Sequence, residues 1–503
     1  MPAPSLCAPG AALARVLDLG MLRRPPDPAR DHAASACLPL GRGLDPLALL
    51  PQLGGGALSL LESAGPPGRW TLLATHPVAR FVSAGGANRF HWHSRGVTHA
   101  WREAPLDALR RALAAFPRAD ALPGLPPAGG ALGLFAYELG RRLLPLRPHA
   151  TDDLGLPDIA VFFHDRLLAV DRETGDAFAL ATARGASVAE ARREAEAHAA
   201  LLAEALGEAA RQPESPPGAD PACPPPTASL DREGYLEAVA RCREAILDGE
   251  AYELCLTTRF ETSFAGDPLA LYRRLRGATP APYASFLRHP EGVLVGASPE
   301  RFLRVTPEGQ VEARPIKGTR PRGRDAAEDT AQREALAASA KDRAENVMIV
   351  DLLRNDLHRV CAPGSVHVSE LCAVETHPAV FQLVSTIEGE LDPGRDRCDL
   401  LASAFPGGSM TGAPKIAAMQ ILETLEPVVR GWYSGCLGYL GFDGSLDLSI
   451  VIRSIQLVKG RALVGAGGAV VYDSDPEAEW AEAEHKAAAA LRALGATAVS
   501  RAT

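Results

Sequence analysis

Lysine is scarce in this 503-residue chain. Five of its 52 basic residues are lysines, at positions 317, 341, 415, 459 and 486, and the other 47 are arginines. Arginine keeps its charge, whereas burial can turn lysine into a neutral nucleophile, so the two are not interchangeable where a covalent bond must form. The first lysine, Lys317, lies in the segment Arg-Pro-Ile-Lys-Gly-Thr at 314–319. Its retention indicates chemistry at the amine; a surface ion pair is the alternative.

Several other features are missing, and each absence excludes a class of protein. The nine cysteines are odd in number and form no Cys-x-x-Cys pair, which predicts reduced thiols and no zinc site. A net charge of -9 argues against nucleic acid or an anionic membrane as a partner. No run approaches 18 apolar residues, and the N-terminus lacks a signal-peptide pattern. We therefore expect a cytoplasmic protein without a membrane span.

Proline divides the chain into two regions. With 47% hydrophobic and 22% charged residues, 503 residues can bury a large core. Seven prolines between positions 211 and 227 predict an exposed, extended connector. It separates an N-terminal region, 1–210, from a C-terminal region, 228–503, in which the dense motifs lie.

Local patterns predict both helices and strands. Ser187 with Glu190 has the spacing of a capping box, and Gly207 suits the end of that helix. Asp475 followed by Pro476 predicts the start of the last helix. The pattern is typical of the α+β class. The helices expected are 187–207, 231–247, 326–359 and 476–494, and the strands expected in the C-terminal region are 252–260, 292–296, 384–390, 435–442, 449–457 and 462–471.

Three carboxylates fall on two of the expected helices. Glu345 lies among apolar residues in one, and Glu479 and Glu482 lie one turn apart in the other, with Lys486 one turn further on. Two helices that each bring a carboxylate to one cleft would form a Mg²⁺ site. Ordinary ion pairs along a solvated helix face are the alternative.

A fourth carboxylate, Glu300, follows Pro299 at the end of an apolar strand. Partial burial there would raise its pKa and make it a general acid, whereas a pair with Arg301 would be structural. The glycine-rich loop 405–415 is suited to hold an anion on its backbone N–H groups. Residues 465–469 are typical of a strand that passes close to a ligand.

Six motifs together carry a resemblance to a known family. They are SPERF (298–302), PIKGT (315–319), KDRAENVMIVDLLRND (341–356), GGSMTGAPK (407–415), IRSI (452–455) and DPEAEWAEAEHK (475–486). The chain resembles the chorismate-utilising enzymes, which include anthranilate synthase large subunits, aminodeoxychorismate synthase component I and isochorismate synthases. The resemblance runs from about 235 to 494. It implies an α/β/β/α sandwich with the active site in the cleft between two large sheets.

Two positions indicate the branch of the family. Anthranilate synthases have alanine where Lys317 stands, and many members have histidine where Gln382 stands before Leu-Val-Ser. The resemblance is therefore to the aminodeoxychorismate synthase component I branch, and it implies amination of chorismate by ammonia to 4-amino-4-deoxychorismate, for 4-aminobenzoate and folate synthesis. Synthesis of anthranilate or isochorismate is one alternative. A member without activity, kept for binding or regulation, is the other.

The resemblance also implies residue roles. Lys317 would attack C2 of chorismate while Glu300 protonates the departing C4 hydroxyl, after which ammonia attacks C4 and expels the lysine. Mg²⁺ and desolvation would lower the pKa of the amine. Glu345 and Glu482 would hold Mg²⁺, with Glu479 as a neighbour or water-mediated ligand. The matching substrate-binding positions are Gly318, Thr319, Thr411, Lys415, Tyr439, Arg453, Gly467 and Gly468.

Two further expectations concern partners. No glutaminase signature is present, so ammonia is expected from free solution or from a separate glutamine amidotransferase subunit. The family's tryptophan pocket is partly matched, with alanine at 284 in place of the usual methionine. The residues that match that pocket are Leu61, Glu62, Ser63, Pro282 and Tyr283.

Overall fold

Two large antiparallel sheets form the centre of the protein. The structure is a computed structural model that describes residues 32–53, 56–63, 68–211, 223–377 and 380–496, and within them each sheet has 12 strands. The first sheet runs, in spatial order, β1 (His32–Arg42), β10 (Asp176–Gly185), β9 (Arg166–Asp171), β3 (Trp70–Thr75), β2 (Leu58–Glu62), β13 (Tyr283–His289), β14 (Gly292–Ser298), β23 (Ser454–Val458), β24 (Arg461–Val470), β12 (Glu253–Ser263) and β11 (Thr227–Ala228), with β20 (Gly412–Ala413) also on β12.

The second sheet also has 12 strands, and it too combines strands from the N-terminal and C-terminal regions. Its order is β17 (Ile316–Pro321), β19 (Val380–Glu390), β16 (Gln310–Arg314), β15 (Arg301–Val305), β22 (Leu446–Ile450), β21 (Cys436–Gly441), β7 (Gly130–Phe135), β8 (Ile159–His164), β4 (Ala79–Ala84), β5 (Ala87–Trp92) and β6 (Val97–Arg102), with β18 (His367–Thr376) also on β19.

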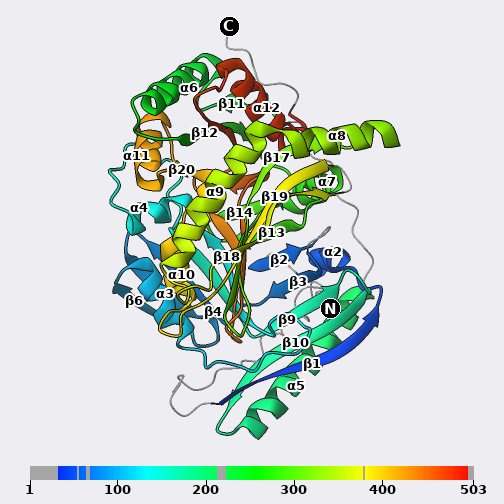
Figure 1. Ribbon diagram of the computed structural model, residues 1–503. Helices are drawn as coiled ribbons and strands as arrows, with labels where there is room; N and C mark the ends of the chain where they lie inside the picture. The colour runs from blue at the N-terminus through cyan, green and yellow to red at the C-terminus, as the bar shows by residue number, and fades with distance from the viewer. Residues whose placement is uncertain (1–31, 54–55, 64–67, 212–222, 378–379, 497–503) are drawn as a thin grey trace, which may run out of the picture.

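Helices cover the outer face of each sheet. Figure 1 shows α5 along β1 and β10, and α12 beside α6 at the opposite end of the molecule. The first sheet packs against α5 (Val188–Ala210), α6 (Arg232–Leu247), α7 (Pro268–Ala278), α11 (Lys415–Leu425) and α12 (Pro476–Ala493). The second packs against α3 (Pro105–Leu113), α8 (Ala326–Ala338), α9 (Ala340–His358) and α10 (Arg397–Ala404). The expected α/β/β/α sandwich of the α+β class is confirmed.

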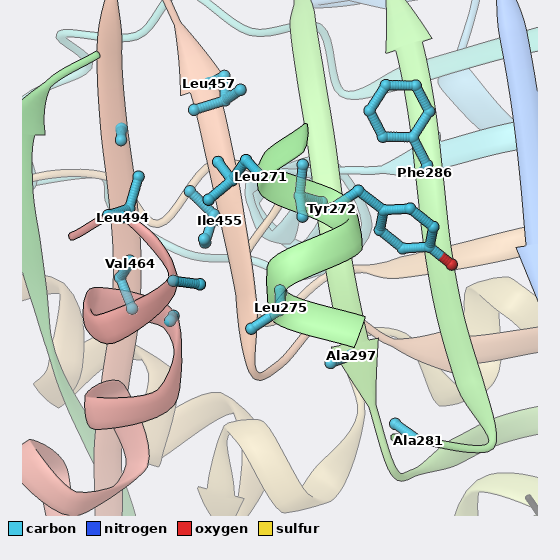
Figure 2. Close-up of a cluster of buried hydrophobic side chains, with 14 of the residues drawn as sticks. Leu271, Tyr272, Leu275, Ala281, Phe286, Ala297, Ile455, Leu457, Val464 and Leu494 are labelled. Carbon is cyan, nitrogen blue, oxygen red and sulfur yellow. The ribbon is translucent and has the colours of Figure 1, made fainter. Parts of the chain in front are cut away.

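The central strands of each sheet bury both faces, so their residues alternate between two cores. On β13, Leu287 packs between the sheets, whereas Phe286 packs toward the helices. On β7, Leu134 faces the inner core and Phe135 the helix side of the second sheet. Figure 2 shows the outer core of the first sheet, where Leu271 and Leu275 of α7 lie over β23 and β14. Two-sided burial fits the nearly continuous apolar sequence of central strands such as β8, whereas the end strand β6 is exposed and more polar.

The two regions of the sequence share both sheets. In the first sheet β2 of the N-terminal region pairs with β13, and in the second β7 pairs with β21. Residues 212–222 of the proline-rich connector lie outside the described residues. The division at the connector is therefore a feature of the sequence, while hydrogen-bonded strands join the two regions.

The predicted helices form, with two differences in their bounds. Ser187 and Asp475 cap α5 and α12 as the sequence indicates, and Asp231, at the predicted start of its helix, proves to cap α6. However, α5 continues past Gly207 to Ala210. The stretch predicted as one helix over 326–359 is two helices, because Ser339 is extended (φ -65°, ψ 106°), ends α8 and caps α9. A serine oxygen that accepts a backbone N–H starts a new helix at that point.

One predicted strand also proves to be two. The first residues of the run 449–457 belong to β22 in the second sheet, and its last residues belong to β23 in the first sheet. Arg453 lies between the two strands with φ 52°. A left-handed residue turns the chain sharply enough to leave one sheet for the other.

All eight cysteines in the described residues are free thiols. No helix in the described part of the chain is long and apolar enough to cross a membrane.

Candidate active site

Lys317 bridges the two sheets. It lies on β17, the end strand of the second sheet, and its Nζ donates to Oε1 of Glu253 at 2.6 Å. Glu253 begins β12 of the first sheet, where Leu254 and Leu256 face the helices and Glu253 faces the opposite way. Glu253 is 0% exposed, and its Oε2 has no hydrogen-bond partner in the described residues. A buried amine thus meets a buried, half-satisfied carboxylate.

The pKa of Lys317 is raised, not lowered as the sequence led us to expect. Burial by itself lowers the pKa of this amine, but the negative charges of Glu253 and Glu345 outweigh burial and hold the pKa above its ordinary value. The prediction named Mg²⁺ and desolvation as causes of a lower pKa and missed the charge of Glu253. The raised pKa and the contact with Glu253 favour the ammonium form of Lys317.

Glu300 lies where the chain passes from the first sheet to the second, between β14 and β15. Burial raises the pKa of its carboxyl to about 7, against the opposing effects of a Ser409 hydrogen bond and the Lys317 charge. The backbone N–H of Ile316, next to Lys317, also donates to this carboxyl. Glu300 is therefore protonated in a substantial fraction of molecules near pH 7 and is placed beside the lysine segment.

Arg453 lies at the second crossing between the sheets, next to the first. Its carbonyl accepts from Ala297 N at 3.2 Å, and the carbonyl of Glu300 accepts from Ile450 N at 3.1 Å. Burial lowers the pKa of the Arg453 guanidinium, with Tyr433 and Glu482 opposing that shift. The arginine accordingly supplies a largely buried positive charge on the α12 side of the cluster.

The three predicted carboxylates of α9 and α12 come together. Lys341 Nζ lies 3.8 Å from Glu345 Oε1 and 3.9 Å from Glu479 Oε1, so it joins the two helices. Glu482 is half-exposed and pairs with Lys486 at 2.5 Å. Gly468 of β24 passes beneath them, and a Cβ there would lie 2.5 Å from Oε2 of Glu479. A larger residue at this position would therefore displace the Glu479 carboxylate from its present place.

The electrostatics of this group fit a divalent cation. Burial raises the pKa of Glu345 to about 7, and the charges of Glu253 and Glu482 act in the same direction. Burial also raises the pKa of Glu479, whose Oε2 is buried without a hydrogen-bond partner in the described residues. No group of three or more His, Cys, Asp or Glu in the described residues is arranged to hold a metal by itself. Mg²⁺ takes one or two protein carboxylates and completes its shell with water and ligand oxygens, which matches this set.

The remaining backbone positions line the same cluster. Gly318 has φ 82°, and a Cβ there would lie 2.8 Å from the Asp342 carboxyl, so this position needs glycine. Thr319 is exposed and pairs with Gln382 across β17 and β19. The carbonyl oxygen of Gly467 accepts a hydrogen bond from Lys486 Nζ at 2.8 Å. The resemblance had named the two glycines and Thr319, and the structure puts them on the strands that carry the cluster.

The glycine-rich loop 405–415 packs against β12. It contains a single 3-10 turn, η4 (Gly408–Met410), then β20, and α11 begins at Lys415. Thr411 is fully buried, and its carbonyl accepts from Cys255 N at 3.1 Å. Ser409 reaches Glu300 from this loop. The loop therefore borders the cluster on the side of Glu300, the candidate general acid.

Lys415 is engaged elsewhere. Its Nζ donates to Asp356 Oδ2 at 2.7 Å and to the carbonyl of Ala404 at 2.8 Å. Both side chains are nearly buried, and burial lowers the pKa of the amine against the effect of Asp356. The structure thus gives Lys415 a structural ion pair with α9, and we do not assign it to substrate binding.

Tyr439 lies away from the Lys317 cluster, on the wall of a cavity of about 630 Å³ that we call the second cavity. This cavity brings together all five residues matched to the tryptophan pocket, with Ala284 also on its wall. Tyr439 lies on its lining with Arg301 and Asp447, whose charges surround the phenol. We therefore correct its assignment from the Lys317 cluster to this cavity. The five matched residues are Leu61, Glu62, Ser63, Pro282 and Tyr283.

Three residues of the cluster were missed from the sequence. Glu253 stands at the start of an apolar strand pattern, and a lone carboxylate there was a usable signal. Tyr433 is buried, and its phenol lies close enough to Arg453 for each to shift the pKa of the other. Ser409 had no distinguishing pattern. Their roles depend on contacts between distant segments.

Similarity to known proteins assigns the family. A family model described as chorismate binding enzyme matches residues 59–492. The chain is 48% identical over 360 residues to an aminodeoxychorismate synthase of Streptomyces pristinaespiralis, covering 69% of this chain and 49% of that protein. It is 38% identical over 433 residues to aminodeoxychorismate synthase component 1 of Escherichia coli (strain K12), covering 85% and 90%. The chain belongs to the chorismate binding enzymes.

A solved structure agrees with this assignment. Anthranilate synthase component I from Streptococcus pneumoniae TIGR4 matches with a TM-score of 0.72 and 29% identity, over 90% of this chain and 97% of that one. The chain spans about half the length of its Streptomyces relative and nine-tenths of the E. coli one.

Proposed function

We propose that the chain aminates chorismate with ammonia to give 4-amino-4-deoxychorismate. The observation that carries this proposal is the buried Lys317 amine in one cluster with Glu300, in a chain whose relatives include proteins named aminodeoxychorismate synthase. A nucleophile and a proton donor at one site are what a poor hydroxide leaving group requires. The product would serve 4-aminobenzoate and folate synthesis.

In this proposal Lys317 Nζ attacks C2 while Glu300 gives its proton to the C4 hydroxyl, which leaves as water. Ammonia then attacks C4 and expels the lysine amine, so two allylic shifts place nitrogen at C4. The pKa of about 7 for Glu300 supports the first step, because a carboxyl that is partly protonated near neutral pH can act as an acid.

Glu345 and Glu482 would hold Mg²⁺, with Glu479 as a near or water-mediated ligand. The bound ion would neutralise a carboxylate of chorismate. Arg453 supplies a further cation, and Gly318, Thr319, Thr411, Gly467 and Gly468 would contact the substrate through backbone or hydroxyl groups. Tyr433 joins this set because its phenol faces Arg453.

The ammonia is proposed to come from a separate glutamine amidotransferase subunit or from free solution, since no glutaminase signature is found in the sequence. The second cavity is proposed to hold tryptophan, on the strength of the five matched residues that line it. A cytoplasmic location is part of the same proposal.

The proposal is tested with the purified chain, chorismate, Mg²⁺ and ammonium salt at mildly alkaline pH, where NH₃ is available. We expect 4-amino-4-deoxychorismate by chromatography and no product when glutamine replaces ammonium. An ortho-amino product would identify an anthranilate synthase, and isochorismate an isochorismate synthase. Either outcome would overturn the proposed reaction.

A further inference from the structure

The state of Lys317 in the structure differs from the state that its proposed role requires. The amine must be neutral to attack C2, yet its Nζ donates to Glu253 at 2.6 Å and its pKa is raised, which favours the ammonium form. One proton therefore has to leave Lys317 before the bond forms. The site is buried, so the proton needs an acceptor within the cluster.

We propose that Glu253 accepts the Lys317 proton during attack on the substrate and returns it when the amine departs. This inference rests on the proposed function and adds a residue to it. The carboxylate is fully buried, its Oε1 already accepts from Nζ, and its Oε2 has no hydrogen-bond partner in the described residues. An acceptor with this geometry needs no movement of the chain to take the proton.

The other groups that face Lys317 are unsuited to the task. Glu300 must carry a proton of its own to release the hydroxyl, and Glu345 and Glu482, from α9 and α12, are the proposed cation ligands. Cys255, two residues along β12, is a thiol whose pKa burial raises. Lys486, whose charge also reaches the cluster, is itself a cation. Glu253 is the acceptor that remains.

The proton count closes over the cycle. The pair begins as Lys317 ammonium and Glu253 carboxylate and becomes neutral amine and carboxylic acid. The amine bonds to C2, and Glu300 supplies the proton that turns the C4 hydroxyl into water. When ammonia bonds to C4, the C2–N bond breaks and the lysine leaves as a neutral amine. It then recovers its proton from Glu253, while Glu300 takes one from the new ammonium group. The sum is chorismate and ammonia giving aminated product and water.

The scarcity of lysine makes the proton on Lys317 directly observable. Labelling with [ε-13C]lysine gives five NMR resonances in this chain, and Lys317→Arg assigns the one of interest. We expect its titration midpoint to lie above the ordinary value of a lysine amine and to fall by more than one pH unit in Glu253→Gln, which keeps the shape and removes the charge. Glu484→Gln, which removes an exposed carboxylate of α12 that does not act on the Lys317 amine, is the control and should leave the midpoint near its original value. An unchanged midpoint in Glu253→Gln overturns the proposal.

A single-turnover measurement tests the transfer itself. Incubation with chorismate and Mg²⁺ without ammonia should trap the substrate on Lys317, and mass spectrometry follows the rate. In the unaltered chain Lys317 and Glu253 share one transferable proton across pH 6 to 8. In Glu253→Gln the Lys317 amine must instead lose this proton to solvent before it can attack. The ratio of variant rate to unaltered rate should therefore rise by about tenfold per pH unit. Effects of Glu300 cancel in this ratio.

The outcomes separate the two proposals. A ratio that is reduced equally at every pH means that Glu253 only positions the amine, and the proposed transfer is then wrong. No adduct in the unaltered chain, with a normal NMR shift in Glu253→Gln, overturns the covalent route of the proposed function while the control of the lysine charge by Glu253 stands.

Discussion

The surroundings of Lys317 and Lys415 are alike in their contacts and different in their consequences. Both side chains are nearly buried, at 10% and 11% exposed, and each amine lies within 2.7 Å of a buried carboxylate. Each pair also joins distant elements, β17 with β12 in one case and α11 with α9 in the other. Contact distance and burial alone would assign the two lysines the same role.

The difference lies in what surrounds each pair. Lys415 has a second acceptor, the carbonyl of Ala404, and the pKa of its amine is lowered by burial. Lys317 faces Glu253, Glu345 and Glu300, and the pKa of its amine is raised. An amine satisfied on several sides by fixed groups is structural, whereas one held among several titratable acids has acceptors and donors for proton transfer. The predictions below test this distinction.

The largest effect is expected from removal of Lys317. Lys317→Ala should lower the rate of 4-amino-4-deoxychorismate formation by on the order of a thousandfold or more, because the nucleophile is lost. Residual product should shift toward the ortho-amino type, since ammonia could then reach C2 directly. Chromatography of the products measures both, and Lys459→Ala is the control. An unchanged rate and product would mean that Lys317 only binds substrate.

Loss of the cation ligands should come next. Glu345→Ala and Glu482→Ala should each lower activity by about a hundredfold or more, because the charge that holds Mg²⁺ is removed. Excess EDTA should do the same to the unaltered chain. Glu484→Ala, an exposed carboxylate on the same helix, should have little effect. Full activity in EDTA would show that no metal is needed.

The pair at Lys415 should respond in stability instead of chemistry. Lys415→Met leaves Asp356 charged and buried, which should cost about 3 kcal/mol in the free energy of unfolding. The identity of the product should not change. Urea denaturation measures the loss, and the double variant Lys415→Met with Asp356→Asn should recover part of it. If the Lys415→Met protein had normal stability and made a different product, Lys415 would have a chemical role and not the structural role assigned to it.

The last prediction concerns how the stability of the fold near Lys317 depends on pH, and its size in any one pH unit is smaller than the Lys415 effect. The pKa of Glu300 is about 7 in the folded chain against an ordinary 4.5, so the folded state binds more protons between these values. Its contribution to stability should therefore be complete below about pH 4.5 and be lost as pH rises through 7, by at most about 1.4 kcal/mol per unit. Glu300→Gln should flatten this part of the profile in urea denaturation at pH 5, 6 and 7. A profile parallel to that of the unaltered chain would argue against the raised pKa.

Much of the fold could be predicted from local sequence signals. Ser187, Asp231 and Asp475 start their helices as predicted, because a helix cap depends on residues only two or three positions away. The break at Ser339 was missed although serine is a cap residue, since the apolar pattern continues on both sides. The run 449–457 was read as one strand because both of its halves are apolar.

The sequence by itself determined the family motifs, the single early lysine and the carboxylates of α9 and α12, since these are properties of residue type and spacing. Only the tertiary structure decided that Glu253 meets Lys317 across 64 residues, that Lys415 pairs with Asp356, and that Tyr439 lines the second cavity. The physical reason is that each of these contacts joins separate elements, and that strands such as β12 and β21 are buried on both faces. Alternation along such a strand shows that neighbouring residues point opposite ways, but which partner covers each face depends on how the two sheets and their helices pack.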